Sequence, residues 1–329
     1  MALLLMLSAC STDVDLYADY KDITVVYGLL DSGADTNFIK INKAFLGPGN
    51  AMDIALIDDS CNYPGKLDAK LVEYRGTSNG TNYQKTGEFP LDTLTVHHKD
   101  LGIFYAPHQL VYYTTNKLKS NTNQNRYRYE LQINRGDTIV KATTNIVGGG
   151  SFSIPQASLN FGSNASNGVI SWTPCLYASI YEVVIKFNFI EVGPSNDSVH
   201  RCMTWALGAH PETELTNENG VYSVQFNPSM FFDNLANMLG ADTLNNNVER
   251  LISEPSIEVS IAAGGDELYN FITVNGPSSS IVQTLPEYTN VQGGFGVLSS
   301  RVMLTKRMRM AGSTIPELIA HENWHFRQM

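Results

Sequence analysis

The sequence is poor in charged residues, which make up 16% of its 329 positions, and the formal net charge is -10 without long runs of one sign. Nucleic-acid binding needs a basic face, so this composition argues against it. Mild acidity instead suits a secreted or surface protein that must stay soluble. No stretch approaches the roughly 18 consecutive apolar residues of a membrane-spanning helix. Neither a GxSxG motif nor a phosphate-binding loop is present, so the common nucleophile and nucleotide signatures are lacking.

Cysteine is also scarce, with four residues at positions 10, 61, 175 and 202. None of them stands in a CxxC pair, which argues against a zinc ribbon or a thiol redox motif. Cys175 and Cys202 flank neighbouring predicted strands and could form a disulfide in an oxidising compartment. The alternative, slightly favoured here, is that the cysteines after Cys10 are small buried hydrophobic side chains.

The N-terminus carries the most specific localisation signal in the chain. An apolar run ends in Leu7, Ser8, Ala9 and Cys10, the order of a bacterial lipobox, and a polar acidic stretch follows. Small residues fit the signal peptidase cleft, and the thiol of Cys10 accepts the lipid. Residues 1–21 are therefore predicted to be a lipoprotein signal peptide and tether, with Cys10 carrying palmitate-type acyl chains. The alternative is a buried N-terminal segment with a chance cysteine, because no Lys or Arg precedes the apolar run.

Short alternating apolar segments separated by turn residues predict a mainly β protein of two tandem sandwich domains. Residues 23–30 and 38–45 read as an antiparallel hairpin, within an N-terminal immunoglobulin-type sandwich of residues 22–148. Three glycines, Gly148 to Gly150, look like a linker. Residues 151–329 are expected to form a fibronectin III-like sandwich with Trp172 in its core, helical insertions, and a terminal helix over residues 316–329.

One motif points to enzyme chemistry. His321, Glu322 and His325 spell HExxH, which on a helix places two zinc ligands on one face beside a general base. Only four residues follow it, so a third ligand must come from upstream, and the candidate histidines are His97, His98, His108, His200 and His210. The favoured alternative is a terminal amphipathic helix that packs Leu318, Ile319 and Trp324 on the second domain. No metal or catalytic residue is therefore assigned.

The tripeptide Arg135-Gly136-Asp137 matches an integrin-binding motif in letters. It also stands where two predicted strands must turn, and Asn-Arg-Gly-Asp supplies the glycine that a hairpin turn favours. The turn is the preferred interpretation.

Residues 22–47 and 169–191, together with the lipobox, resemble a family of uncharacterised lipoproteins of the Bacteroidota. The resemblance implies an outer-membrane lipoprotein with immunoglobulin-like domains, and it brings no established activity. In that phylum, acidic residues soon after the lipidated cysteine contribute to display on the cell surface. Asp13 and Asp15 look like a partial match, which implies a protein that faces the cell exterior.

These observations predict a non-enzymatic lipoprotein without a cofactor, held to the outer membrane by its lipid. Its expected role is protein–protein interaction: a binding or structural subunit of an outer-membrane β-barrel complex for nutrient import or protein assembly, beside other surface lipoproteins. Rigid sheets that present loops and edge strands suit such a role. Two alternatives stay open: a zinc-dependent hydrolase that uses the C-terminal HExxH, and an adhesin or fimbrial-type subunit.

Overall fold

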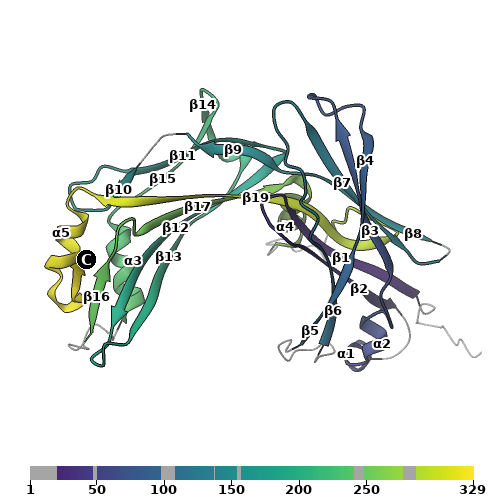
Figure 1. Ribbon diagram of the computed structural model, residues 1–329, viewed down its shortest axis with the longest axis horizontal. Coiled ribbons are helices and arrows are strands. Elements are labelled where there is room, and N and C mark those ends of the chain that lie inside the picture. The colour runs from purple at the N-terminus through teal and green to yellow at the C-terminus, as the bar shows by residue number, and fades with distance from the viewer. Residues whose placement is uncertain are drawn as a thin grey trace, which may run out of the picture.

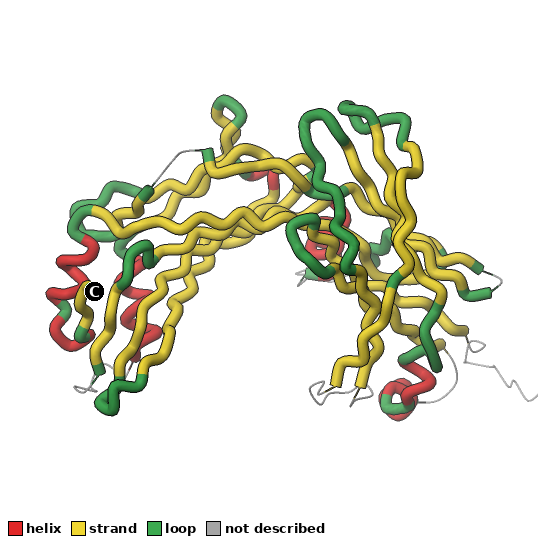
Figure 2. Tube along the Cα trace, in the orientation of Figure 1, coloured by secondary structure: helices red, strands yellow, loops and turns green. Residues whose placement is uncertain are grey.

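The computed structural model describes residues 21–46, 50–97, 108–136, 138–153, 157–240, 248–276 and 287–329. The predicted lipobox with Cys10 and the tether lie outside the described residues, as do His98 and Asp137. The protein is mainly β, as expected, with 57% strand and 15% helix. The strands form three open sheets. Figure 1 shows an arch with two halves, and Figure 2 shows that strands dominate both of them.

The largest sheet has eleven strands and runs through both halves of the arch. Its strands in the N-terminal half are β1 (Lys21–Asp31), β2 (Asn37–Leu46), β5 (Asp92–His97) and β6 (His108–Thr114). Those that follow in the chain are β10 (Ser158–Asn160), β12 (Ala178–Val192), β13 (Ser198–Pro211), β16 (Glu249–Ile252), β17 (Ile257–Gly265), β19 (Gly294–Ala311) and β20 (Phe326–Gln328).

Two smaller sheets each cover one part of the large sheet. The five-stranded sheet lies in the N-terminal half and contains β3 (Asp68–Gly76), β4 (Gln84–Pro90), β7 (Arg126–Asn134), β8 (Ile139–Asn145) and β18 (Val291–Gln292). The four-stranded sheet lies in the other half and contains β9 (Gly148–Phe152), β11 (Gly168–Leu176), β14 (Thr216–Glu218) and β15 (Val221–Phe226).

The helices are short. They are α1 (Ala51–Ala55), α2 (Asp58–Cys61), α3 (Met230–Leu239), α4 (Asp266–Asn275) and α5 (Thr314–Ala320), with 3-10 turns η1 (Glu212–Glu214) and η3 (Glu322–Trp324). In the described part of the chain, none has the length and apolar character that crossing a bilayer requires.

Strand β19 connects the two halves. Its first part pairs in parallel with β1, from Gly294 opposite Thr24 to Arg301 opposite Asp31. Its second part pairs antiparallel with β17, from Arg301 to Met308. One continuous strand therefore belongs to both halves, and Figure 1 shows it running along the arch.

Each half has its own apolar core between two sheets. In the N-terminal half, Val26, Leu30 and Ile39 of the large sheet meet Leu71 and Leu131 of the five-stranded sheet, and all five are fully buried. Burying such side chains contributes roughly 1.5–3 kcal/mol each, which makes these cores the main source of stability.

In the other half, Trp172 of β11 is fully buried, as the sequence predicts, and its ring lies 5.4 Å from that of Tyr181 on β12. Helix α3 closes this core at its far end, where Phe231 stacks on Phe161 with ring centroids 4.4 Å apart. This aromatic cluster joins the four-stranded sheet, the large sheet and α3.

The finer prediction of two tandem immunoglobulin-like sandwiches is not shown, because a single sheet passes through both halves. The three glycines expected to form a linker belong to strand β9, which pairs with β11 from Gly148 opposite Leu176 to Phe152 opposite Trp172. The predicted hairpin of residues 23–30 and 38–45 is present as β1 and β2.

Candidate functional site

The HExxH segment does not lie on one helix. Helix α5 ends at Ala320, the 3-10 turn η3 follows, and His325 adopts a left-handed conformation with φ of 53° before β20 begins. The predicted helix over residues 316–329 is therefore wrong beyond Ala320. The reason is tertiary: Phe326 is buried in the core and pairs with Arg250 of β16, so the chain must extend there.

The two histidines consequently lose the one-turn spacing that makes HExxH a zinc site. The His321 ring stacks on the Trp324 indole with centroids 4.1 Å apart, and the buried Nε2 atom of His325 has no hydrogen-bond partner. Within the described ranges, no group of three His, Cys, Asp or Glu side chains is placed to hold a metal ion. The upstream candidates His97, His108, His200 and His210 are thus not gathered around the motif.

A buried arginine holds the terminal segment instead. Arg250 is 1% exposed, and its Nη1 donates to the Trp324 carbonyl oxygen at 2.9 Å. Its Nε and Nη2 lie 3.1 and 3.0 Å from Oε2 of Glu191 on β12. The Arg250 amide also donates to the His325 carbonyl at 2.9 Å. These contacts give the terminal segment a structural role.

Cys175 and Cys202 are both thiols in the structure, the first buried and the second exposed. Cys202 lies on β13 next to Met203, which is 2% exposed, so the two side chains point to opposite faces of the sheet. Cys175 lies in the core on the Met203 side, where burial raises the pKa of its thiol to about 12. A disulfide between the two would have to pass through the sheet.

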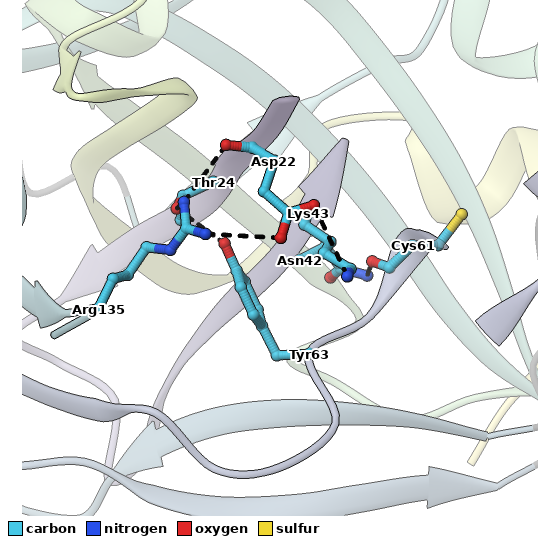
Figure 3. A network of polar contacts seen from close by, with 7 residues as sticks. All are labelled: Asp22, Thr24, Asn42, Lys43, Cys61, Tyr63 and Arg135. Atoms are coloured by element: carbon cyan, nitrogen blue, oxygen red, sulfur yellow. Dashed lines mark hydrogen bonds and ion pairs between the residues drawn. The ribbon is translucent and has the colours of Figure 1, made fainter. Parts of the chain in front are cut away.

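A network of polar contacts around Asp22 holds the start of strand β1 in place (Figure 3). Arg135 reaches from the turn after β7 toward Asp22, with Nη2 at 3.6 Å from Oδ2, and its Nη1 donates to Thr24 Oγ1 at 3.3 Å. Lys43 Nζ lies 3.7 Å from the same carboxylate. The Tyr63 hydroxyl and Thr24 Oγ1 form a hydrogen bond of 2.8 Å, and burial raises the pKa of the Tyr63 phenol.

This network gives Arg135, the first residue of the Arg-Gly-Asp tripeptide, a structural role. The Arg135 amide donates to the Thr138 carbonyl at 2.9 Å, which closes the turn between β7 and β8, and Gly136 has a φ of +89°. Because its guanidinium contacts Asp22 and lies 5.3 Å from the Tyr63 ring centroid, Arg135 serves the fold. It ties the start of β1, where the predicted tether would join, to the five-stranded sheet.

The N-terminal half of the large sheet carries exposed apolar side chains on one of its faces. We call this side the outer apolar face, and it comprises large side chains that are 41–50% exposed: Tyr27, Phe38, Leu94, Val96, Ile272 and Phe295. The registers place its five strand residues on one side. Val25 and Tyr27 pair with Phe295 and Val297 of β19, and Tyr27 also pairs with Lys40, two residues along β2 from Phe38. Phe38 pairs with Tyr113, which pairs with Asp92, two residues along β5 from Leu94.

Helix α4, which carries Ile272, packs on the same side of the sheet. The Leu268 amide donates to Ser299 Oγ at 3.1 Å, and the Phe271 ring meets Tyr27 edge-on with centroids 6.0 Å apart. A sheet face that meets water normally carries polar residues. Exposed aromatic and aliphatic side chains gathered on one face are typical of a binding surface, and here Lys40, Asn42 and Gln109 of the same face lie among them. Sequence alternation assigns Phe38 and Lys40 to one face, but only the pairing of four separate strands reveals the surface.

No protein-family model matches the chain, and a search of curated proteins finds no match. The resemblance to Bacteroidota lipoproteins therefore stays a prediction.

Proposed function

We propose that the chain is an outer-membrane, surface-exposed lipoprotein that acts as a non-catalytic binding or structural subunit of an outer-membrane β-barrel complex. The lipobox at Cys10 supports the anchor, and the continuous sheet that runs through both halves of the arch supports a structural role. The outer apolar face is the observation that carries the binding function. Exposed aromatic side chains on a rigid sheet lose little conformational entropy when a partner covers them.

The network around Asp22 supports this arrangement. It fixes the start of β1 in the same half as the outer apolar face, through Arg135 and Lys43. A lipid-anchored chain that enters the fold there would keep this half next to the membrane. The partner surface expected is therefore the membrane-proximal part of a barrel complex.

The finer fold interpretation, two tandem immunoglobulin or fibronectin III-like sandwiches, belongs to the same proposal. Two separate apolar cores, each between two sheets, support it. The shared strand β19 speaks against independent domains, so the relationship would be one of architecture within each half.

The test is purification from native membranes in mild detergent, with identification of the proteins that accompany the chain. We expect a barrel protein to accompany the wild-type protein, and Phe38→Lys to abolish this association. Met303→Lys is the matched control, because Met303 is 45% exposed on β19 of the same sheet, beyond the stretch that pairs with β1. Equal recovery of the barrel protein with both variants would contradict the proposed surface.

A second arm tests the anchor. Cys10→Ala should release the protein from membranes, since each buried CH₂ of an acyl chain contributes about 0.8 kcal/mol. Retention of Cys10→Ala in the outer membrane at high salt would mean that another element holds the protein.

Of the two alternatives, the zinc-dependent hydrolase is supported by no observation among the described residues around His321. An adhesin or fimbrial-type subunit needs a strand that is available for pairing between chains. Strand β13, which lies at an edge of the large sheet, is such a strand.

A further inference from the structure

Strand β13 lies at an edge of the large sheet. It has 14 residues, and within the described part of the chain it pairs only with β12. The hydrogen bonds along this antiparallel pair alternate between bonded and non-bonded residue pairs. The Gly193 amide donates to the Asp197 carbonyl, which makes residues 193 and 197 a bonded pair. The Asn188 amide donates to Ser256 on the other side of β12, so Asn188 and its partner Cys202 form a non-bonded pair.

It follows that every second residue of β13 directs its N–H and C=O away from β12. These residues are Ser198, His200, Cys202, Thr204 and Ala206, and the side chains of all five are exposed. The stretch is regular until the register shift opposite Val183 and Val184, after which Gly208 has a φ of +106°. A row of unpaired backbone donors and acceptors is a template for another β-strand.

The regular stretch runs from Ser198 to Ala206, and its central residue is Cys202. Antiparallel pairing of this stretch with itself about a twofold axis at Cys202 places Ser198 opposite Ala206 and His200 opposite Thr204. All five outward residues then form backbone hydrogen bonds. The one charged side chain of the stretch, Arg201, faces Met203 of the other copy rather than a second arginine, so no like charges oppose each other.

We propose that two copies of this chain associate through β13, in antiparallel register, with the twofold axis at Cys202. The two large sheets become one continuous sheet, and the surface is the same patch on both copies, as in most twofold dimers. The inference is independent of the outer apolar face, which lies on other strands. Loss of the barrel partner and loss of self-association are therefore separate results.

The first measurement is the mass of the full-length protein in mild detergent, by sedimentation equilibrium over a range of concentrations. We expect a concentration-dependent dimer. In Thr204→Pro the missing N–H is one that points away from β12, so the fold keeps its own ladder. This variant should weaken self-association roughly tenfold or more, because two hydrogen bonds are lost per dimer. Circular dichroism checks that the variant is folded.

The second measurement needs no disruptive substitution and tests the register. The Cα atoms of a bonded antiparallel pair are about 5.5 Å apart, within the range that a disulfide spans. Addition of diamide, which takes up the two electrons and two protons released by the thiols, should therefore cross-link two copies at Cys202. Thr204→Cys in a Cys202→Ala background is the matched control. Its thiol is equally exposed but lies opposite His200, so it should not cross-link.

A monomer at every concentration, without a cross-link at Cys202, would overturn the proposal. Equal cross-linking at positions 202 and 204 would also overturn it, since it would indicate random collision. Protection of β13 by a different protein in native membranes, with no second copy present, is a third contrary outcome.

Discussion

Arg250 is a cation with 1% of its surface exposed, and its contacts join β16, β12 and the C-terminal segment. Arg250→Ala should lower the free energy of unfolding by about 3–5 kcal/mol, because it leaves Glu191 without its buried partner. Arg201→Ala is the control: Arg201 contacts the same carboxylate at 3.0 Å but is 41% exposed, so its loss should cost less than about 1 kcal/mol. Urea unfolding measures both, and equal effects would contradict this assignment.

Glu267 lies at the first turn of α4, where its Oε2 accepts hydrogen bonds from Thr144 Oγ1 at 3.0 Å and Ser299 Oγ at 3.1 Å. Burial raises the pKa of this carboxyl, and the neighbouring Asp266 adds to the shift. A raised pKa in the folded state stabilises the protonated form. The stability that Glu267 contributes is therefore fully present below the pKa that its carboxyl has in the unfolded chain. This stability is lost as the pH rises through the raised pKa of the folded state.

Glu267→Gln keeps an acceptor for both hydroxyls and removes the charge. The variant should therefore be more stable than the wild type above the folded pKa of Glu267, and the difference should shrink as the pH falls. Thermal unfolding from pH 4 to pH 8 measures this. A difference that grows on acidification would contradict the sign.

At the scale of elements, the terminal segment α5–η3–β20 is held by packing. Trp324 is 8% exposed, so Trp324→Ala should destabilise the protein by about 3–5 kcal/mol. Glu322 is exposed, and Glu322→Gln should change stability by less than about 0.5 kcal/mol. Elemental analysis of the purified protein should find no stoichiometric zinc. One zinc per chain, together with hydrolysis that Glu322→Gln abolishes, would restore the hydrolase alternative.

The pairing of β1 with β19 requires close backbone approach. Gly296 has a φ of +106°, and a Cβ atom there would lie 2.0 Å from the Val26 carbonyl oxygen. Gly296→Ala should cost about 3 kcal/mol or more, since strain and overlap add. Gly136 has a similar φ of +89°, but a Cβ atom there would meet nothing within 4 Å, so Gly136→Ala should cost only about 1–2 kcal/mol. Chemical denaturation distinguishes the two, and equal losses would show that strain alone matters.

At the scale of the whole molecule, β19 belongs to both halves through its pairs with β1 and β17. We expect one cooperative unfolding transition, and limited proteolysis should spare residues 148–152, because β9 is paired with β11. The alternative boundary expected from three glycines predicts the opposite result. Early cleavage between Gly148 and Phe152, or two separate calorimetric transitions, would support independent domains.

Local pattern predicts some of these features well. The hairpin of β1 and β2 is evident because Ile39 and Ile41 alternate with polar residues, and both are buried against the five-stranded sheet. Trp172 is an expected core residue, since a large apolar side chain in a short strand has few other places to go. Such features depend on neighbours in sequence or on side-chain type alone.

The sequence pattern does not predict which distant segments pair with each other in a sheet. Gly148 to Gly150 are conformationally free in an isolated chain, yet pairing with β11 orders them as strand β9. The sequence pattern predicts a helix that continues after Ala320, but the chain leaves the helix there because Trp324 and Phe326 are buried. The outer apolar face assembles from four strands and a helix that lie far apart in the sequence.

The sequence by itself thus determined the mainly β composition, the turn at Arg135-Gly136 and the alternation that gives each strand a core face. These follow from local propensity and from the two-residue period of a strand. Only the tertiary structure decided that one sheet passes through both halves, that the HExxH histidines separate, and that β13 lies at an edge of the large sheet. Each of these depends on which strand lies beside which, and that is settled by the summed burial of residues far apart along the chain.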